Sequence, residues 1–228
     1  MKLTVVIPAY NEEQTIDEIL GRVQAVPIEK EILVVDDASG DATRERLRAH
    51  EAAGTVQMIE HPINRGKGAA VRTGLKEARG EIVIIQDADL EYDPNDYPRV
   101  IGPIERGEAD VVYGSRFLAG RHVTSFWHYS VNAFLTRLSN LMTGLRLTDM
   151  ETCYKAFRRA VVADLELVSN GFDIEPELTA KLARRGVRFA EVPISYQERS
   201  YDEGKKINWR DGVRALVAIA RFGLFARR

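Results

Sequence analysis

The sequence has a single cysteine, no long apolar run and almost no net charge, and each shortage excludes a class of protein. Cys153 has no partner for an internal disulfide, so we expect a reducing compartment. No stretch approaches the roughly 20 apolar residues that span a bilayer, and the run at residues 3–7 is too short for a signal peptide. The net charge of −2 gives no general attraction to nucleic acid. We therefore expect a cytoplasmic protein without a membrane span or a nucleic-acid partner.

Two glycine-rich phosphate-binding patterns are also missing. The pattern G-x-G-x-x-G does not follow the first apolar run, which argues against a dinucleotide-binding protein. The segment at residues 64–74, NRGKGAAVRTG, lacks the spacing of a Walker A loop. Its glycines, at the start of a helical pattern, would still let the backbone approach an anion, with Lys67 supplying positive charge. An ordinary glycine turn is the other interpretation of this segment.

Short runs rich in valine and isoleucine alternate with segments of helical spacing up to about residue 115. Strands are predicted at 3–8, 31–36, 56–60, 81–86 and 110–113. Helices are predicted near 13–24, 41–50, 67–78 and 95–106. Asp93 is a candidate N-cap for the last of these, with Pro94 in its first turn. Buried strands interleaved with helices indicate an α/β, Rossmann-like fold with a mostly parallel sheet and helices on both faces.

The second half of the chain has a different pattern but no linker, internal repeat or low-complexity tract. Helices are predicted at about 124–142, with a wide apolar face, at 174–185 and at 208–225, and strands near 153–158 and at 187–194. We therefore predict one domain over residues 1–228.

Acidic and polar residues collect where three of the predicted strands end. The clusters are Pro8-Ala9-Tyr10-Asn11-Glu12, Asp36-Asp37-Ala38-Ser39 and Asp87-Ala88-Asp89. Each cluster alone could cap a helix. Together they indicate a ligand site, because converging carboxylates repel one another unless they hold a cation or a ribose. A D-x-D pair suits Mg²⁺ or Mn²⁺, with Glu91 as a possible further ligand.

An ordered set of motifs across nearly the whole chain resembles the family 2 inverting glycosyltransferases, and within them the polyprenyl-phosphate hexose synthases. The motifs are VVIPAYNEE, VVDDASGDAT, NRGKGAAVRTG, QDADLEYDP, YGSRF, LTDMETCYKAFRR, GFDIEPELTAKLARRG and VPISYQERSYDEGKK. The resemblance implies a GT-A fold and a nucleotide-sugar donor. It also implies transfer of a hexose to a polyprenyl or dolichyl phosphate.

The resemblance further implies which residues serve the donor and the metal. Those that would bind the donor are Pro8, Ala9, Tyr10, Glu12, Asp36, Asp37, Lys67 and Asp87. Those that would hold Mg²⁺ or Mn²⁺ are Asp87, Asp89 and Glu91, and the catalytic residues would be Asp89, Arg116 and Glu175. On this basis we divide the chain into a nucleotide-sugar-binding half (1–115), an acceptor-binding half (116–206) and a basic amphipathic helix (207–228).

Basic residues on the second half are candidates for binding the acceptor. They are Arg116, Arg199, Lys205 and Lys206. A guanidinium matches a phosphate bidentately, and an anionic phosphate acceptor needs no general base. A hydroxyl acceptor would need a carboxylate base, for which Glu175 and Glu177 are the candidates.

Residues 205–228 carry seven basic residues against one acid, interleaved with aromatic and aliphatic residues. Such a helix suits peripheral contact with the cytoplasmic face of a membrane, although a helix packed on the protein with its arginines in water is the other interpretation.

Several alternatives remain open at this point. A sugar-nucleotide nucleotidyltransferase and a glycosyltransferase that acts on a hydroxyl are the enzymatic ones, and a non-catalytic binding module is a third. For the donor, the motif set favours UDP-glucose, with GDP-mannose next.

Overall fold

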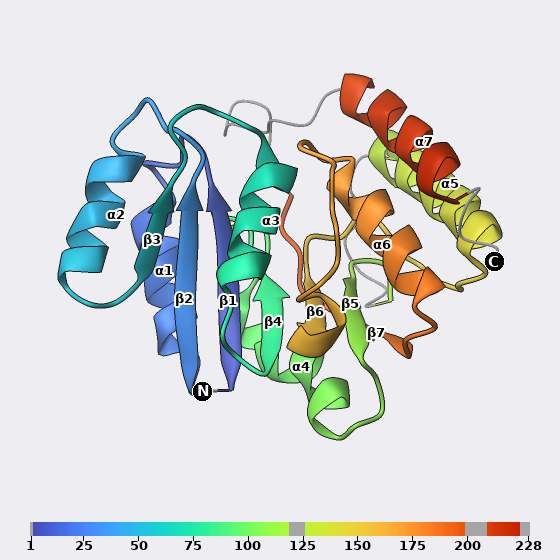
Figure 1. The fold of residues 1–228 in the computed structure, drawn as a ribbon, viewed down its shortest axis with the longest axis horizontal. Helices are drawn as coiled ribbons and strands as arrows, with labels where there is room; N and C mark the ends of the chain where they lie inside the picture. The colour runs from blue at the N-terminus through green and yellow to red at the C-terminus, as the bar shows by residue number, and fades with distance from the viewer. Residues whose placement is uncertain (1, 119–125, 199–208, 224–228) are drawn as a thin grey trace.

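A single sheet runs through the computed structural model, which describes residues 2–118, 126–198 and 209–223 (Figure 1). Its strands are β1 (Leu3–Ala9), β2 (Lys30–Asp36), β3 (Gln57–Glu60), β4 (Ile82–Ile85), β5 (Val111–Ser115), β6 (Lys155–Arg158) and β7 (Phe189–Pro193). Their order across the sheet is β3-β2-β1-β4-β6-β5-β7.

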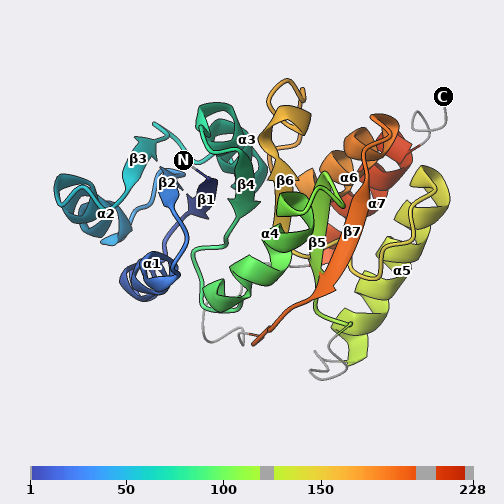
Figure 2. The ribbon, with the colours of Figure 1, turned by 90° about the horizontal axis from the view of Figure 1, so that it is seen from below.

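Helices cover both faces of this sheet. They are α1 (Ile16–Ala25), α2 (Thr43–Ala52), α3 (Lys67–Glu77), α4 (Tyr97–Glu105), α5 (Phe126–Thr143), α6 (Ile174–Arg184) and α7 (Trp209–Gly223). Two short 3₁₀ turns, η1 (Pro94–Asp96) and η2 (Arg159–Val161), join them. Figure 2 shows α3 and α6 on one face and α1 and α4 on the other, while α5 and α7 lie beside α6. The predicted α/β, GT-A-like architecture is confirmed.

The central strands are apolar because both of their faces are covered. In β1 every residue except Pro8 is buried, and all of β4 is buried. The helices instead bury one stripe each, as in α1, where Ile16, Ile19, Leu20 and Val23 face the core. Asp93 was predicted to cap the helix at 95–106. It instead caps the short turn η1, accepting a hydrogen bond from the backbone N–H of Asn95, and α4 begins only at Tyr97.

One strand runs against the others, which the sequence pattern did not predict. Within the described part of the chain, β6 pairs antiparallel with both β4 and β5, whereas the remaining pairs are parallel. Its first residue, Lys155, therefore lies at the edge of the sheet where β4 and β5 end. This reversal brings the segment at 147–154 to the same edge as the acidic clusters.

The basic C-terminal helix packs on the protein through its apolar face. Ala215, Ala218, Ile219 and Phe222 of α7 are buried, while Arg210, Arg214 and Arg221 are exposed. Val213 and Val217 are 49% and 61% exposed, so part of its apolar surface stays in solvent. None of the helices formed by the described residues combines the length and apolar character needed to cross a membrane.

Candidate active site

The loops that follow β1 and β2 lie side by side at the carboxyl edge of the sheet. Ala9 pairs with Asp36 in the parallel register, and the backbone N–H of Asn11 donates to Ser39 Oγ at 3.0 Å. Asn11 and Ala38 adopt positive φ angles of 49° and 62°, which residues other than glycine rarely do. Strained turns of this kind concentrate at functional sites.

The first loop presents residues that the sequence assigned to the donor. Pro8 and Ala9 end β1, and the ring of Tyr10 is 38% exposed beyond them. Glu12 is nearly buried and accepts a hydrogen bond from Thr15 Oγ1 at 3.0 Å. Tyr10 is thus the most accessible of the four.

Asp37 organises the loop before α3. One of its carboxylate oxygens accepts from His61 Nδ1 at 2.7 Å, and the carboxylate also accepts the backbone N–H groups of Arg65 and Gly66. His61 Nε2 lies 2.9 Å from Thr73 Oγ1 on α3. Asp37 therefore holds the Asn64–Lys67 segment in place, a role that the sequence did not suggest.

Asp36 has structural partners as well. It is fully buried, and its carboxylate accepts from Arg44 Nε at 2.9 Å and from the backbone N–H of Ser39 at 3.2 Å. Its side chain thereby ties the end of β2 to α2.

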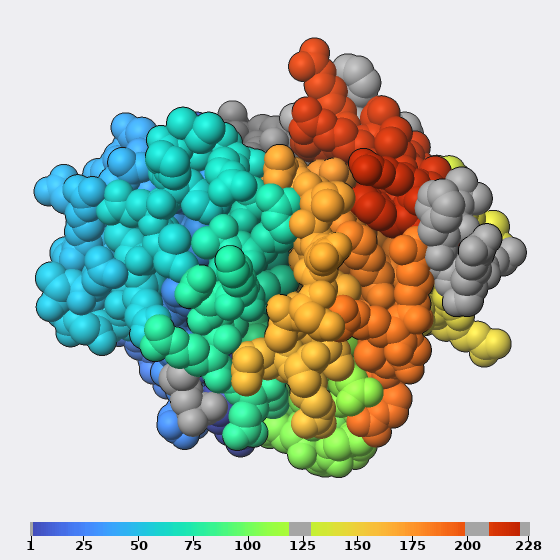
Figure 3. Space-filling view, in the orientation of Figure 1, coloured from blue at the N-terminus to red at the C-terminus, as the bar shows by residue number. Residues whose placement is uncertain are grey.

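The glycines of the NRGKG segment allow a close approach to the loop before α6. A Cβ atom at Gly66 would lie 2.4 Å from the carbonyl oxygen of Asn170, and one at Gly68 would lie 2.6 Å from that of Ser169. Gly66 also has φ +93°, which favours glycine. Figure 3 shows the two segments in contact, with the 166–173 segment in orange against α3 in teal and α7 in red above them. The close approach fixes the start of α3, and with it Lys67.

Lys67 lies between two carboxylates. Its Nζ is 2.6 Å from Asp87 Oδ1 and 3.8 Å from Glu175 Oε1. Burial lowers the pKa of Lys67, but the negative charges around it, Asp87 first, raise that pKa well above its ordinary value. Glu175 in turn lies 2.5 Å from Nζ of the fully buried Lys155. The structure therefore brings together Lys67, Asp87 and Glu175, as the sequence suggested, and adds Lys155.

The other two candidate metal ligands, Asp89 and Glu91, lie in the loop after β4. Asp89 is 7% exposed and accepts the backbone N–H of Glu91 at 3.0 Å. Glu91 accepts a hydrogen bond from the hydroxyl of Tyr196 at 3.1 Å. Glu91 thus faces the segment after β7.

The acidic edge fits a hard cation shared with a ligand. Across the described residues no three His, Cys, Asp or Glu side chains gather closely enough to hold a metal ion by themselves. Mg²⁺ commonly takes only one or two carboxylates and completes its shell with water and phosphate oxygens. Asp87 and Asp89, one on either side of Ala88, are the two carboxylates that could hold such an ion.

Arg116 directly follows β5 and forms an ion pair with the fully buried Asp149. Its Nε lies 2.7 Å from Asp149 Oδ2 and its Nη2 lies 2.8 Å from Oδ1. Burial lowers the pKa of Arg116, but Asp149 raises it well above its ordinary value. The guanidinium also lies over the ring of Tyr196, at 5.1 Å. The guanidinium group expected to bind a phosphate is thus already hydrogen-bonded in part to Asp149.

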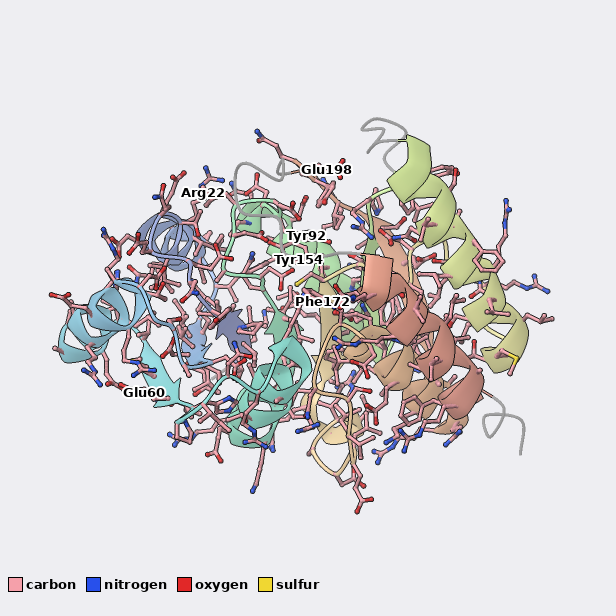
Figure 4. All side chains as sticks on the ribbon, turned by 90° about the horizontal axis from the view of Figure 1, so that it is seen from above. Arg22, Glu60, Tyr92, Tyr154, Phe172 and Glu198 are labelled. Atoms are coloured by element: carbon pink, nitrogen blue, oxygen red, sulfur yellow. The ribbon has the colours of Figure 1, made fainter. Side chains whose placement is uncertain are left out.

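An aromatic cluster lies between the acidic edge and Arg116. Tyr92 is 4.8 Å from Tyr154 and 5.2 Å from Tyr196 between ring centroids. Figure 4 looks down on the carboxyl ends of the parallel strands and shows Tyr92 and Tyr154 near Phe172, between the helices of the two halves. The rings of Tyr92 and Tyr154 are buried and give this part of the site a rigid apolar base.

Glu177, one of the two base candidates, has a structural role. Burial raises its pKa, but hydrogen bonds from Lys181, Ser169 and Val168 outweigh burial and lower it. The other predicted acceptor residues, Arg199, Lys205 and Lys206, lie outside the described residues.

Sequence reasoning overlooked Lys155, Asp149 and His61 as members of this region. Lys155 and Asp149 belong to the motif LTDMETCYKAFRR, to which no residue roles were attached. A lysine at the start of the buried strand β6 was the available signal, because buried lysines are almost always paired.

Comparison with known proteins gives a consistent result. Residues 4–166 match the family described as glycosyl transferase family 2. The chain is 31% identical to an undecaprenyl-phosphate mannosyltransferase from Micrococcus luteus, over 100% of this chain and 96% of the relative. It is 32% identical to a dolichol-phosphate mannosyltransferase from Pyrococcus furiosus, over 90% of this chain and 59% of the relative.

The fold also resembles that of a solved glucosyl-3-phosphoglycerate synthase from Mycobacterium tuberculosis, in complex with Mn²⁺, UDP and its product. The TM-score is 0.72 at 22% identity, over 97% of this chain and 79% of that chain. The family match covers most of the chain and sets aside both the nucleotidyltransferase and the non-catalytic module. The chain belongs to glycosyl transferase family 2 and is a glycosyltransferase related to the polyprenyl-phosphate sugar transferases.

Proposed function

We propose that this enzyme transfers a hexose from a nucleotide-diphosphate sugar to the phosphate of a polyprenyl phosphate. In this proposal residues 1–115 bind the donor and residues 116–206 bind the acceptor. The C-terminal helix lies against a membrane surface.

The observation that carries the proposal is the contact of Tyr196 with both halves of the site. Its hydroxyl donates to Glu91, two residues beyond Asp89, and its ring lies under the guanidinium of Arg116. The acidic edge proposed to bind the cation is thus only one side chain away from Arg116. The anionic leaving group would bind at the cation on the acidic edge, and the anionic acceptor would bind at Arg116.

The chain's own residues supply positioning and charge in this reaction. Lys67 places a positive charge beside Asp87 at the start of α3, where a donor diphosphate would be anionic. A divalent cation bound by Asp87 and Asp89 would neutralise the diphosphate as a leaving group. Arg116 would orient the acceptor phosphate, and the aromatic cluster would exclude water from one side.

For the donor we propose GDP-mannose first and UDP-glucose second. The motif set alone favoured UDP-glucose. Both relatives named above are mannosyltransferases, and one of them matches the full length of this chain. These names support mannose over glucose.

For delivery of the acceptor we propose contact between α7 and an anionic membrane. The exposed arginines Arg214 and Arg221 line a groove of 560 Å³ together with Arg65 and the loop before α6. Each basic residue near an anionic surface adds roughly 1 kcal/mol of attraction, less at high salt. The two exposed valines of α7 lie on the same helix.

A donor and acceptor screen tests the proposed function. Purified enzyme is incubated with radiolabelled GDP-mannose or UDP-glucose, a short polyprenyl phosphate, and Mg²⁺ or Mn²⁺. We expect label in an acid-labile, solvent-extractable product, with more from GDP-mannose. Transfer of label only to a sugar hydroxyl would overturn the proposal of a phosphate acceptor. A preference for UDP-glucose would overturn the proposed order of donors.

A further inference from the structure

Glu151 lies in the segment that joins α5 to β6, and it ends in an unusual environment. Among the side chains that the structure describes, its Oε1 and the Oγ1 of Thr152 are the buried oxygens without a hydrogen-bond partner. Thr152 is fully buried, and Glu151 is half-buried. Buried polar atoms are nearly always paired, so two adjacent unpaired oxygens call for an explanation.

The position of these oxygens points to the active site. Because β6 runs antiparallel to its neighbours, residues 151–154 lie at the edge where β4 and β5 end. The carboxyl of Glu151 interacts electrostatically with two ion pairs, Arg116 with Asp149 and Lys155 with Glu175. Glu151 is therefore close both to the proposed acceptor arginine and to the chain of charges that reaches the donor side.

Each cation that interacts with Glu151 is already paired with another carboxylate. Arg116 is paired with Asp149, and Lys155 is paired with Glu175. Burial first, and then the charge of Glu175, raise the pKa of Glu151 to about 7, although Lys155 and Arg116 lower it. Tyr113 also interacts electrostatically with Glu151, but burial raises the pKa of its hydroxyl, so Tyr113 stays neutral. A carboxyl in this position exchanges its proton near neutral pH.

We propose that Glu151 shares a proton with the phosphate of the acceptor and retains that proton during sugar transfer. This inference rests on the proposed function, because it requires a phosphate monoester acceptor. The second pKa of such a phosphate is about 6. Two fully ionised groups would repel each other at this site, whereas one shared proton lets them form a charge-assisted hydrogen bond.

Atoms, protons and charge are conserved in the resulting transfer step. The acceptor enters as a hydrogenphosphate monoanion and gives its proton to the Glu151 carboxylate. A phosphate oxygen forms the bond to the anomeric carbon of the sugar, and the bond from that carbon to the donor diphosphate breaks. The products are a neutral Glu151 carboxyl, a phosphodiester monoanion and a nucleoside diphosphate that carries the displaced electron pair. Glu151 releases its proton to water before the next cycle.

Neither of the base candidates from the sequence is as well placed for this exchange. Glu175 is paired with Lys155 at 2.5 Å and lies 3.8 Å from Lys67. Both oxygens of Glu177 are bound by backbone N–H groups, and Oε1 also accepts from Lys181. The first carboxylate is thus already engaged with two cations, and the second is held by backbone N–H groups and Lys181.

The test compares Glu151→Gln with wild type and with a control, Glu166→Gln, which removes an exposed carboxylate from the segment between β6 and α6. In wild type we expect kcat/KM to fall on both sides of a maximum. The alkaline limb, near pH 7, would come from Glu151, and the acidic limb, near about pH 6, from the acceptor phosphate. Glu151→Gln should lose the limb near pH 7 and about 10²-fold or more of kcat. Glu151→Asp should keep the limb at a reduced rate.

Two further measurements separate a chemical role from a structural one. Calorimetric titration with the short polyprenyl phosphate at pH 8, in buffers of different ionisation enthalpy, should show uptake of about one proton by wild type and by Glu166→Gln. Glu151→Gln should take up less, while a near-native circular dichroism spectrum shows that its fold is retained.

A limb near pH 7 that persists in Glu151→Gln, or unchanged proton uptake, would overturn the role of Glu151 while leaving the proposed function intact. Absence of transfer to any polyprenyl phosphate by wild type would overturn the proposed function, and the role of Glu151 with it.

Discussion

Lys155 and Glu175 form a buried ion pair, with 2.5 Å between Nζ and Oε2, that joins the start of β6 to the start of α6. Glu175 also lies 3.8 Å from Lys67, which pairs with Asp87 at 2.6 Å. Acidic and basic side chains therefore alternate from the end of β4 across to β6. Each charge is compensated only while its neighbours are in place, so the chain of charges fixes the relative positions of four elements at the site.

Removing Lys155 should destabilise the protein strongly. Lys155→Met leaves the carboxylate of Glu175 buried with only the more distant Lys67 as a cation. Loss of one partner of a buried pair costs about 3–5 kcal/mol. We expect a loss of this size in the free energy of unfolding, measured with urea at pH 7. The exposed Lys76→Met is the matched control and should lose little. Equal small losses in both variants would show that the pair contributes no net stability.

Asp89→Asn should abolish sugar transfer without unfolding the protein. The substitution keeps the shape of the side chain and its capacity to accept the backbone N–H of Glu91, but it removes the charge that attracts a divalent cation. We expect loss of transfer, a near-native circular dichroism spectrum and loss of Mn²⁺ binding in calorimetry. Asp164→Asn, which changes an exposed carboxylate, should keep full activity. Full activity of wild type in EDTA would contradict the metal role.

Gly66→Ala should be far more damaging than Gly40→Ala. At Gly66 a Cβ would lie 2.4 Å from the carbonyl oxygen of Asn170, and φ is +93°. At Gly40 no atom lies within 4 Å of the Cβ position. A left-handed glycine replaced by alanine loses more than about 1 kcal/mol, and displacement of Lys67 should also raise KM for the donor. Similar unfolding midpoints for both variants would show that the two loops can separate freely.

The architecture was largely predictable because its signals are local. The centres of β1, β2 and β4 are buried on both faces and are therefore runs of valine, isoleucine and leucine. The D-x-D pair at the end of β4 was recognisable for a similar reason, since carboxylates rarely follow such a strand without a ligand or a cap.

The partners within the site were not predictable, because they come from distant segments. Asp37 and His61 are 24 residues apart, and Arg116 and Asp149 are 33 apart. Periodicity carries no information about such contacts. The reversed direction of β6 was equally hidden, because a run of four residues with polar ends gives no sign of its orientation.

Glu151 should make the stability of the protein depend on pH in a defined direction. Its pKa is raised from 4.5 to about 7 in the folded protein, so between these values the folded state holds a proton that the unfolded chain has released. Its contribution to stability is complete below pH 4.5 and is lost as pH rises to 7. At 1.36 kcal/mol for each pKa unit, the loss is at most about 3 kcal/mol, since the side chain keeps some contact with water.

The unfolding free energy of Glu151→Gln, relative to that of wild type, should therefore increase as pH rises. Glutamine cannot ionise, so above pH 7 the variant avoids the cost of a buried carboxylate among Asp149 and Glu175. We expect the difference in unfolding free energy between variant and wild type to shift in favour of the variant by up to about 3 kcal/mol between pH 5 and pH 8. Urea titrations at the two pH values measure it, and Glu166→Gln should show no such shift. A difference that stays constant between the two pH values would mean that Glu151 is ionised throughout, in conflict with the shared proton proposed for it.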